Sequence, residues 1–334
     1  MSTPRVWVSR PTFADIVARL DAHFEVAAEP AEVRFDAAVL AAKLAACEAA
    51  IVGTKERIGA GEIAAAPRLR IVANLSVGHD NLDLAALSAA GIAASNTAGT
   101  VDDSVAEYSW GLLLGAARRI GAAERWLRAG HWQAIDFTGW LGADVRGRTL
   151  GILGMGRIGQ AIARRAGGFG MQVIYHNRAP LPAGREQACA ARYVDKPTLL
   201  READFLVLAL PLTAQTRHAV GAAELALMKP TALLVNVARG GVLDDAALAA
   251  ALASGRLAGA ALDVHEDEPH VHPALLGLDN VLLSPHIASA SIDTRRAMTA
   301  MAVDNVLALF GHGAHAGRPP TLLNPQVLEH PRQQ

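Results

Sequence analysis

A glycine-rich hexapeptide at residues 154–159 has the spacing of a phosphate-binding turn, G-x-G-x-x-G. It follows an expected strand over 149–153 and opens an expected helix over 158–167, the context that this pattern requires. The first glycine permits a tight turn, the second lets the backbone approach a pyrophosphate, and the third lets the helix pack on the strand. The helix start then offers free N–H groups to the phosphates. The predicted dinucleotide contacts here are Gly154, Met155, Gly156, Arg157, Ile158 and Gly159.

The residues after the next expected strand bear on which dinucleotide is bound. A carboxylate about 20 residues beyond the turn would hydrogen-bond the ribose 2′-hydroxyl of NAD. This chain instead has His176, Asn177 and Arg178 there. An arginine can pair with a 2′-phosphate. We therefore expect NADPH to be preferred over NADH, with Asn177 and Arg178 among the cofactor contacts.

Three further expected strands each end in a charged or titratable group. The strand over 232–236 leads to Arg239, the strand over 259–262 to Glu268, and the strand over 281–283 to His286. Because the carboxyl ends of parallel strands form one edge of the sheet, where ligands bind, these side chains are expected at one site. Together they supply a clamp for anions and an acid–base pair.

In combination these segments resemble the D-2-hydroxyacid dehydrogenases, most closely the glyoxylate/hydroxypyruvate reductase branch. The resemblance covers nearly the whole chain. The matching segments are 154–159, 236–240, 263–269 and 284–289, with 74–81 in the N-terminal part. The departures are mild: Ala98 and Gly99 stand where relatives often have proline, and His265 where they often have an aromatic residue.

The resemblance implies a mechanism that these residue types can support. Arg239 would grip the substrate carboxylate and polarise the 2-keto oxygen. His286 would donate a proton to that oxygen while a hydride arrives from the nicotinamide. Glu268 would hold His286 in place and keep its acid form available near neutrality. The backbone N–H groups of Val77 and Gly78 would complete the carboxylate site.

The resemblance also implies further contacts. Asp263 would hydrogen-bond the nicotinamide carboxamide. Trp140 would reach the substrate pocket of a partner subunit, or else anchor the contact between two subunits. The remaining implied cofactor contacts are Pro211, Thr216, Val237, Ala238, His286 and Ala288.

Acidic residues and histidines are dense between residues 263 and 272, which is one feature of metal sites. Pro269 and Pro273 break any helical pairing of ligands there, and hydride transfer needs no metal. We therefore expect no metal site, and we expect His265, His270 and His272 on the surface.

Along the whole chain, short apolar runs alternate with helix-like stretches, which favours an α/β fold with parallel sheets. The resemblance implies two Rossmann-like or flavodoxin-like domains: a cofactor domain at 99–287, inserted into a substrate domain formed by 1–98 and 288–334. A helix expected over 103–120 is apolar on more than one face, so a second domain or subunit should cover it. We expect a homodimer. The expected strands cover 5–8, 50–52, 69–74, 91–94, 149–153, 172–175, 205–210, 232–236, 259–262 and 281–283.

Composition narrows the class of protein. The length of 334 residues suggests about two domains. The net charge of −1 shows that the chain lacks the excess of basic residues typical of a nucleic-acid binder. The two cysteines form no CxxC pair, which favours a reducing cytoplasm. We find no signal-peptide core and no apolar run long enough to span a membrane, so we expect a cytoplasmic enzyme that binds neither nucleic acid nor membrane.

The expected activity is NAD(P)H-dependent reduction of small 2-keto acids to D-2-hydroxy acids. Glyoxylate and hydroxypyruvate are the first candidates, and 2-ketogluconate is a further one. Two alternatives stay open: oxidation of another small acid, such as formate or phosphite, and a non-enzymatic role as a dinucleotide-sensing interaction protein. The Arg, Glu and His set favours ketone reduction, because that reaction needs a proton donor.

Overall fold

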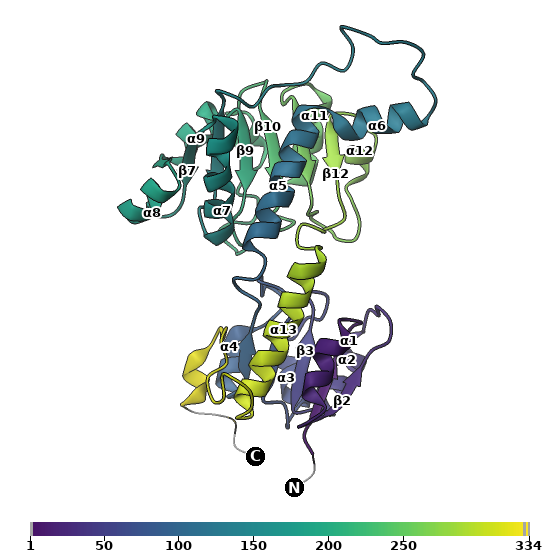
Figure 1. The fold of residues 1–334 in the computed structure, drawn as a ribbon, viewed down its shortest axis with the longest axis vertical. Coiled ribbons are helices and arrows are strands. Elements are labelled where there is room, and N and C mark those ends of the chain that lie inside the picture. The colour runs from purple at the N-terminus through teal and green to yellow at the C-terminus, as the bar shows by residue number, and fades with distance from the viewer. Residues whose placement is uncertain (1–2, 330–331, 333–334) are drawn as a thin grey trace. The chain divides into compact units, whose positions relative to one another are not determined.

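A computed structural model describes residues 3–329 and 332 and divides the chain into two compact units (Figure 1). The split unit comprises Met1–Val101 and Ser291–Gln334, and the central unit comprises Asp102–Ala290. The chain passes from one unit to the other after Val101 and after Ala290. Each boundary lies three residues after the one expected from the sequence, at 98 and at 287.

The split unit is built on a five-stranded parallel sheet in the order β2-β1-β3-β4-β5. Its strands are β1 (Arg5–Val8), β2 (Glu25–Ala28), β3 (Ala49–Val52), β4 (Ile71–Asn74) and β5 (Ala93–Ser95). Strands β3, β4 and β5 are buried throughout, as their apolar sequences predict. The sequence did not predict β2, because this edge strand is largely exposed and its apolar run, 26–28, is only three residues long.

Helices from both ends of the chain cover this sheet. They are α1 (Ala14–Val17), α2 (Ala37–Ala45), α3 (Ala60–Ala65), α4 (Leu84–Ala89) and α13 (Ile292–Leu309), with 3-10 turns η1 (Ala18–Leu20) and η3 (Pro325–Leu328). Ala302, Val303 and Val306 of α13 join the core with residues of β1, β3 and β4. The returning C-terminal segment is therefore part of the N-terminal unit.

The central unit is built on a seven-stranded parallel sheet in the order β12-β11-β10-β9-β6-β7-β8. Its strands are β6 (Thr149–Leu153), β7 (Gln172–His176), β8 (Ala191–Tyr193), β9 (Phe205–Leu208), β10 (Leu233–Asn236), β11 (Gly259–Leu262) and β12 (Val281–Leu283). The chain runs outward in one direction from β6 through β8 and in the other from β9 through β12. The order therefore reverses between β6 and β9, where doubly wound sheets bind dinucleotides. The expected α/β fold with two parallel sheets is confirmed; the edge strand β8 was not expected.

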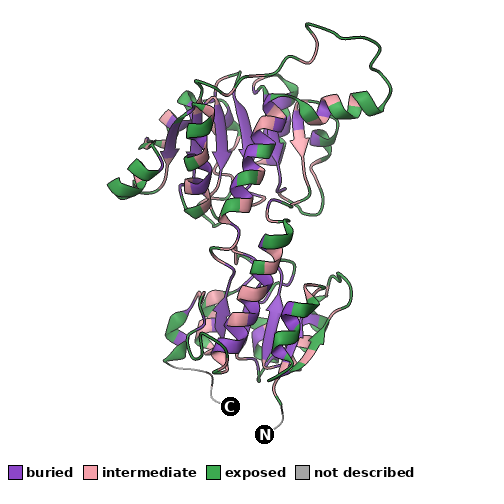
Figure 2. Ribbon diagram, viewed as in Figure 1, coloured by how far each residue is buried: buried purple, intermediate pink, exposed green. Residues whose placement is uncertain are grey.

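Helices lie on the central sheet, and Figure 2 shows its inner strands buried, whereas the edge strands β8 and β12 are only partly buried. The helices are α5 (Asp102–Ala117), α6 (Ile120–Arg128), α7 (Arg157–Ala166), α8 (Ala183–Ala188), α9 (Lys196–Glu202), α10 (Ala222–Leu225), α11 (Asp245–Ala253) and α12 (Pro273–Leu276), with a 3-10 turn η2 (Gly167–Phe169). Asp244 caps α11 by accepting a hydrogen bond from the N–H of Ala247. No helix in the described part of the chain is long and apolar enough to cross a bilayer.

The prediction of a single helix over 103–120 is wrong at the C-terminal end of that range. Helix α5 ends at Ala117, Arg119 takes a left-handed conformation with φ of 54°, and α6 begins at Ile120. The carbonyl of Ala117 accepts a hydrogen bond from the N–H of Ala143. Helix α5 packs against α7 and strands β10 to β12, so its several apolar faces are largely covered within the central unit.

Candidate active site

The glycine turn adopts the geometry that its spacing predicts. Gly154 has φ of 103°, and a Cβ there would lie 2.6 Å from the carbonyl of Ala209. A Cβ at Gly159 would lie 2.3 Å from the carbonyl oxygen of Gly154, so this glycine lets α7 approach the turn. A Cβ at Gly156 would meet nothing within 4 Å, which leaves open space beside the start of α7. A pyrophosphate can approach the backbone there.

The end of β7 holds this turn in place. The amide oxygen of Asn177 accepts a 2.7 Å hydrogen bond from the N–H of Met155. The N–H of Gly154 donates to the carbonyl of His176. No side chain caps the first turn of α7, so the N–H groups near Ile158 are available for an anion. Arg157 is occupied otherwise, because its Nε lies 2.7 Å from a carboxylate oxygen of Asp102.

Arg178 is exposed at the end of β7, and its side chain makes no hydrogen bond or ion pair with any described residue. Nδ1 of His176, two residues earlier in the chain, lies 2.9 Å from the carbonyl oxygen of Val194. A solvated guanidinium without a carboxylate partner is suited to pairing with a phosphate.

The loops after β9 and β10 carry four more of the expected cofactor contacts. The hydroxyl of Thr216 donates to the carbonyl of Pro211 at 2.6 Å, which closes a compact turn. Val237 and Ala238 are buried, and the N–H of Ala238 donates to the side-chain oxygen of Asn236. These contacts shape both loops.

Strands β10, β11 and β12 end level with one another. Asn236, Leu262 and Leu283 are the last residues of the three strands; Asn236 pairs with Leu262, and Leu262 with Leu283. The segments carrying Arg239, Glu268 and His286 therefore leave the sheet at one edge.

Glu268 and His286 are in direct contact. Oε2 of Glu268 lies 2.8 Å from Nδ1 of His286, and both side chains are about one-third exposed, at 35%. Burial is the largest influence and raises the pKa of Glu268. The hydrogen bond and charge interaction with His286, together with the N–H donor of His265, outweigh it and leave that pKa below its usual value. Because the ionised carboxylate only accepts, Nδ1 carries the proton of this bond and Nε2 is left for proton exchange.

Arg239 is half-buried at the end of β10, and one of its terminal nitrogens donates to the carbonyl of Ala238 at 2.9 Å. The next residue, Gly240, lies against the segment that follows β11. A Cβ at Gly240 would lie 1.7 Å from the carbonyl oxygen of His265. Only a glycine permits this approach, which joins the Arg239 segment to the Glu268 segment.

Asp263 anchors the segment that follows β12. It is fully buried, and its carboxylate accepts hydrogen bonds from Ser284 Oγ at 2.7 Å and from the N–H groups of Ile287 and Ala288 at 2.8 Å. Its own carbonyl accepts from the N–H of His286. Asp263 thus holds the segment that carries His286, while its bond to a nicotinamide carboxamide stays a prediction.

The expectation that His265 lies on the surface is wrong. Its exposure is 5%, because it follows the buried strand β11 and turns inward. His270 is exposed as expected, and His272 is half-buried. No group of three or more potential metal ligands gathers anywhere among the residues that the structure describes.

In the split unit, the loop after β4 presents a pair of unused N–H groups. The carbonyls of Val77 and Gly78 accept 2.8 Å hydrogen bonds from the side-chain amides of Asn96 and Asn74. The N–H groups of Val77 and Gly78 make no hydrogen bond to any described residue. A peptide segment fixed by its carbonyls, with its donors free, is suited to binding an anion.

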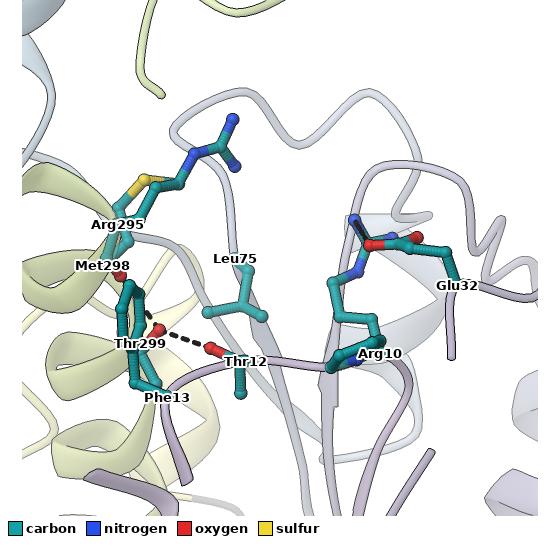
Figure 3. Close-up of a pocket in the computed structure, with 9 residues that line it drawn as sticks. Arg10, Thr12, Phe13, Glu32, Leu75, Arg295, Met298 and Thr299 are labelled. Carbon is teal, nitrogen blue, oxygen red and sulfur yellow. Dashed lines mark hydrogen bonds and ion pairs between the residues drawn. The ribbon is translucent and has the colours of Figure 1, made fainter. Parts of the chain in front are cut away.

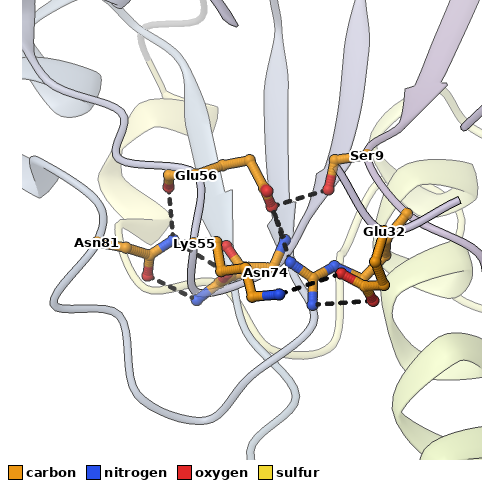
Figure 4. A network of polar contacts seen from close by, with 8 residues as sticks. Ser9, Glu32, Lys55, Glu56, Asn74 and Asn81 are labelled. Carbon is orange, nitrogen blue, oxygen red and sulfur yellow. Dashed lines mark hydrogen bonds and ion pairs between the residues drawn. The ribbon is translucent and has the colours of Figure 1, made fainter. Parts of the chain in front are cut away.

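A buried polar network supports this loop (Figure 4). Glu56 is 2% exposed and accepts hydrogen bonds from Ser9 Oγ at 2.8 Å and from the N–H of Gly53 at 2.6 Å. The amide of Asn81 donates to the carbonyls of Gly53 and Glu56, and it contacts Asn74. An isolated Glu56 in the sequence gives no sign of these distant partners.

A cavity of about 370 Å³ lies in the split unit, where the segments after β1 and β4 meet α13 (Figure 3). The side chains of Arg10 and Glu32 lie on one side and that of Arg295 on the other, with Leu75 between them. Thr299 Oγ1 donates to the carbonyl of Arg295, so the 2.7 Å contact between the two threonine hydroxyls is donated by Thr12. No pattern in the sequence indicated this cavity, because its lining residues come from segments far apart in the chain.

Helix α6 and the loop that follows it extend away from the central sheet (Figure 1). Trp140 packs against Trp126 of α6, with ring centroids 5.4 Å apart, and the Arg119 guanidinium lies over its ring. The most exposed apolar side chains of this arm are instead Ile135 at 89% and Phe137 at 94%. The resemblance pointed to Trp140, whereas nothing in the sequence distinguished Phe137.

Comparison with known proteins identifies the fold and its relatives. The family described as D-isomer specific 2-hydroxyacid dehydrogenase, NAD binding domain, matches residues 110–288. The chain is 43% identical to a glyoxylate reductase of Thermococcus gammatolerans over 98% of this chain and 97% of that protein. It is 41% identical to a glyoxylate reductase of Aeropyrum pernix over 98% of both chains.

The chain is also similar to solved structures of glyoxylate reductases. A glyoxylate reductase from Paecilomyes thermophila superposes with a TM-score of 0.87 at 33% identity, covering 98% of this chain and 100% of that one. An NADPH-dependent glyoxylate/hydroxypyruvate reductase from Sinorhizobium meliloti, in complex with NADP and malonate, has a TM-score of 0.84 at 38% identity and covers 96% of this chain and 97% of that one.

Proposed function

The chain belongs to the D-isomer specific 2-hydroxyacid dehydrogenases, in the glyoxylate reductase branch, and we propose that it reduces small 2-keto acids to D-2-hydroxy acids with NADPH. The observation that carries this proposal is the 2.8 Å contact between Glu268 and His286 at the carboxyl edge of the central sheet. When bound, the nicotinamide cofactor supplies the hydride. The central unit would hold the cofactor, and the split unit would contribute substrate contacts.

His286 is the proton donor in this reaction. Nδ1 is held by the ionised Glu268, so the proton delivered to the 2-keto oxygen leaves from Nε2. The Glu268 carboxylate stabilises the imidazolium before transfer and fixes the ring throughout. Asp263 supports the same segment through its bonds to Ser284 and to the backbone after His286.

Two sets of donors serve the substrate's anionic end. The free N–H groups of Val77 and Gly78 bind the carboxylate, and their fixed carbonyls mean that little ordering is needed on binding. The Arg239 guanidinium, which has a planar set of donors, grips the carboxylate and polarises the keto oxygen.

The cavity beside Leu75 bears on substrate size. Leu75 is two residues before Val77 and three before Gly78, so its Cα lies within about 11 Å of both proposed carboxylate donors. The cavity offers acceptors on Glu32 and Thr12 and donors on Arg10, which suits hydroxyl groups because they both donate and accept. We propose that hydroxypyruvate and longer hydroxylated 2-keto acids, such as 2-ketogluconate, are accepted besides glyoxylate.

The deciding experiment follows NADPH oxidation with a panel of 2-keto acids of increasing chain length. Turnover with glyoxylate and hydroxypyruvate is the expected result. Binding of NADPH without turnover of any acid would instead indicate a dinucleotide-sensing protein. Turnover of glyoxylate alone would leave the reductase in place and reject the cavity as a substrate site.

The exposed arm suggests how the chain assembles. Ile135, Phe137 and Leu141 present large apolar side chains to solvent. Large apolar side chains exposed on one short segment are typical of an interface, and a two-fold pair of identical chains is the commonest assembly. We propose a homodimer in which these arms are covered by the partner, with light scattering at micromolar concentration as the test.

A further inference from the structure

The three segments that carry the proposed catalytic residues all contact His265. Its backbone N–H donates to Oε1 of Glu268 at 3.1 Å. Its Nε2 lies 3.0 Å from the carbonyl oxygen of Ser284, two residues before His286. Its own carbonyl lies against Gly240, the residue after Arg239. A buried histidine thus occupies the point where these segments meet.

The hydrogen-bond roles follow from the atoms involved. The carbonyl of Ser284 can only accept, so Nε2 of His265 carries the proton and donates it. One residue therefore donates in two directions, to the carboxylate of Glu268 and to the segment that carries His286. Glu268 and the segment that carries His286 are therefore both held by donors of His265.

We propose that His265 is a positioning residue that holds Glu268 and His286 at the separation needed for proton transfer. This inference rests on the reductase function proposed above. His265 touches neither reacting atom; it acts through the Ser284 carbonyl and the Glu268 carboxylate. Its side-chain bond sets the distance between the loop after β11 and the loop after β12.

The fold does not depend on this one bond. The Asp263 carboxylate accepts hydrogen bonds from Ser284 Oγ and from the backbone N–H groups of Ile287 and Ala288, so the segment after β12 keeps its anchors when the His265 donor is removed. Removing the donor instead changes the alignment of His286 with Glu268. A misplacement of about 1 Å near a reacting group can cost as much as 10²-fold in rate.

The matched variants are His265→Gln and His265→Met, which have side chains of similar length. Glutamine retains an N–H donor at its tip, whereas methionine fills similar space without one. We expect His265→Met to lower kcat about 10- to 100-fold with little change in KM, and His265→Gln to stay within about 3-fold of the unchanged protein. His270→Met, at an exposed position of the same loop, is the control and should leave kcat unchanged.

A second readout does not depend on turnover. The Nδ1 proton that His286 shares with Glu268 should give a downfield proton resonance, assigned by its loss in His286→Ala. We expect this resonance in the unchanged protein and in His265→Gln, and its loss or broadening in His265→Met. Equal losses of rate in the Gln and Met variants, or an unaltered resonance in His265→Met, would overturn the proposal. A protein that retains this pattern but turns over no 2-keto acid would refute the proposed function alone.

Discussion

Nδ1 of His286 lies 2.8 Å from Oε2 of Glu268, and the other carboxylate oxygen of Glu268 accepts from the N–H of His265. Glu268 is therefore held at both oxygens, and the orientation of His286 depends on a carboxylate that is itself fixed. Asp263 secures the backbone on either side of the same histidine by accepting from the N–H groups of His286 and Ile287. This arrangement underlies the first prediction.

Replacing His286 by alanine should lower kcat about 10²-fold or more, the scale of a lost general acid. The same change should raise the pKa of Glu268, because burial, which raises it, stays while the hydrogen bond that lowers it is removed. Steady-state kinetics and a carbon-13 titration of the Glu268 carboxyl measure the two effects. Near-normal turnover in His286→Ala would refute the catalytic assignment.

Replacing Arg178 by alanine should lower kcat/KM for NADPH about 10-fold and leave that for NADH nearly unchanged, because only NADPH carries the 2′-phosphate. Arg201→Ala removes an exposed charge on α9 of the same unit and serves as the control. Higher kcat/KM with NADH in the unchanged protein would contradict the proposed preference.

Asn96→Ala should raise KM for the 2-keto acid about 10-fold while leaving KM for the cofactor unchanged. The substitution removes the donor that fixes the carbonyl of Val77, so the free N–H groups of this loop lose their fixed direction. Asn280→Ala, which removes a comparable bond to the carbonyl of Leu252, is the control. Equal effects on the KM of both ligands would point to general loss of structure.

Phe137→Ser combined with Ile135→Ser should convert a dimer to monomers at micromolar concentration. These two side chains are the most exposed apolar groups of the arm, and a partner covering them gains the free energy of removing them from water. Light scattering reads the mass directly. Trp132→Ser, on the same loop at 60% exposure, tests whether the effect is confined to the tip of the arm.

Asp204→Asn should lower the free energy of unfolding by about 1–3 kcal/mol at neutral pH. Burial raises the pKa of Asp204, but hydrogen bonds from Lys229 and from the N–H of Thr149 leave it below its usual value. The stabilisation is therefore fully present at pH values above the unfolded-state pKa of an aspartate, about 4. It is lost as the pH falls through the lowered pKa of Asp204 in the folded state. Urea unfolding should show the variant and the unchanged protein converging in acid.

The control for this experiment is Asp279→Asn. Asp279 is strongly exposed and pairs with Arg125 at 3.5 Å, so its replacement should change stability little at any pH. A gap between Asp204→Asn and the unchanged protein that stays constant down to acid pH would show that the carboxylate's charge is not involved.

Local patterns in the sequence determined much of the central sheet. The apolar runs of β6 and β9 to β12, the glycine turn and the Asp244 cap all depend on neighbours within a few residues, so the chain itself displays them. The loops that follow these strands were placed correctly at one edge for the same reason, since parallel strands share a direction.

Tertiary contacts decided the rest. The edge strands β2 and β8 form by pairing with inner strands and not by their own apolar character. The break at Arg119, the burial of His265 and the partners of Asp263 and Glu56 all depend on segments brought together by folding. A residue's type and spacing state what chemistry it can perform. Only the folded chain decides which donors and carboxylates lie within hydrogen-bond distance, because a hydrogen bond requires its two atoms within about 3 Å, however far apart they are in the sequence.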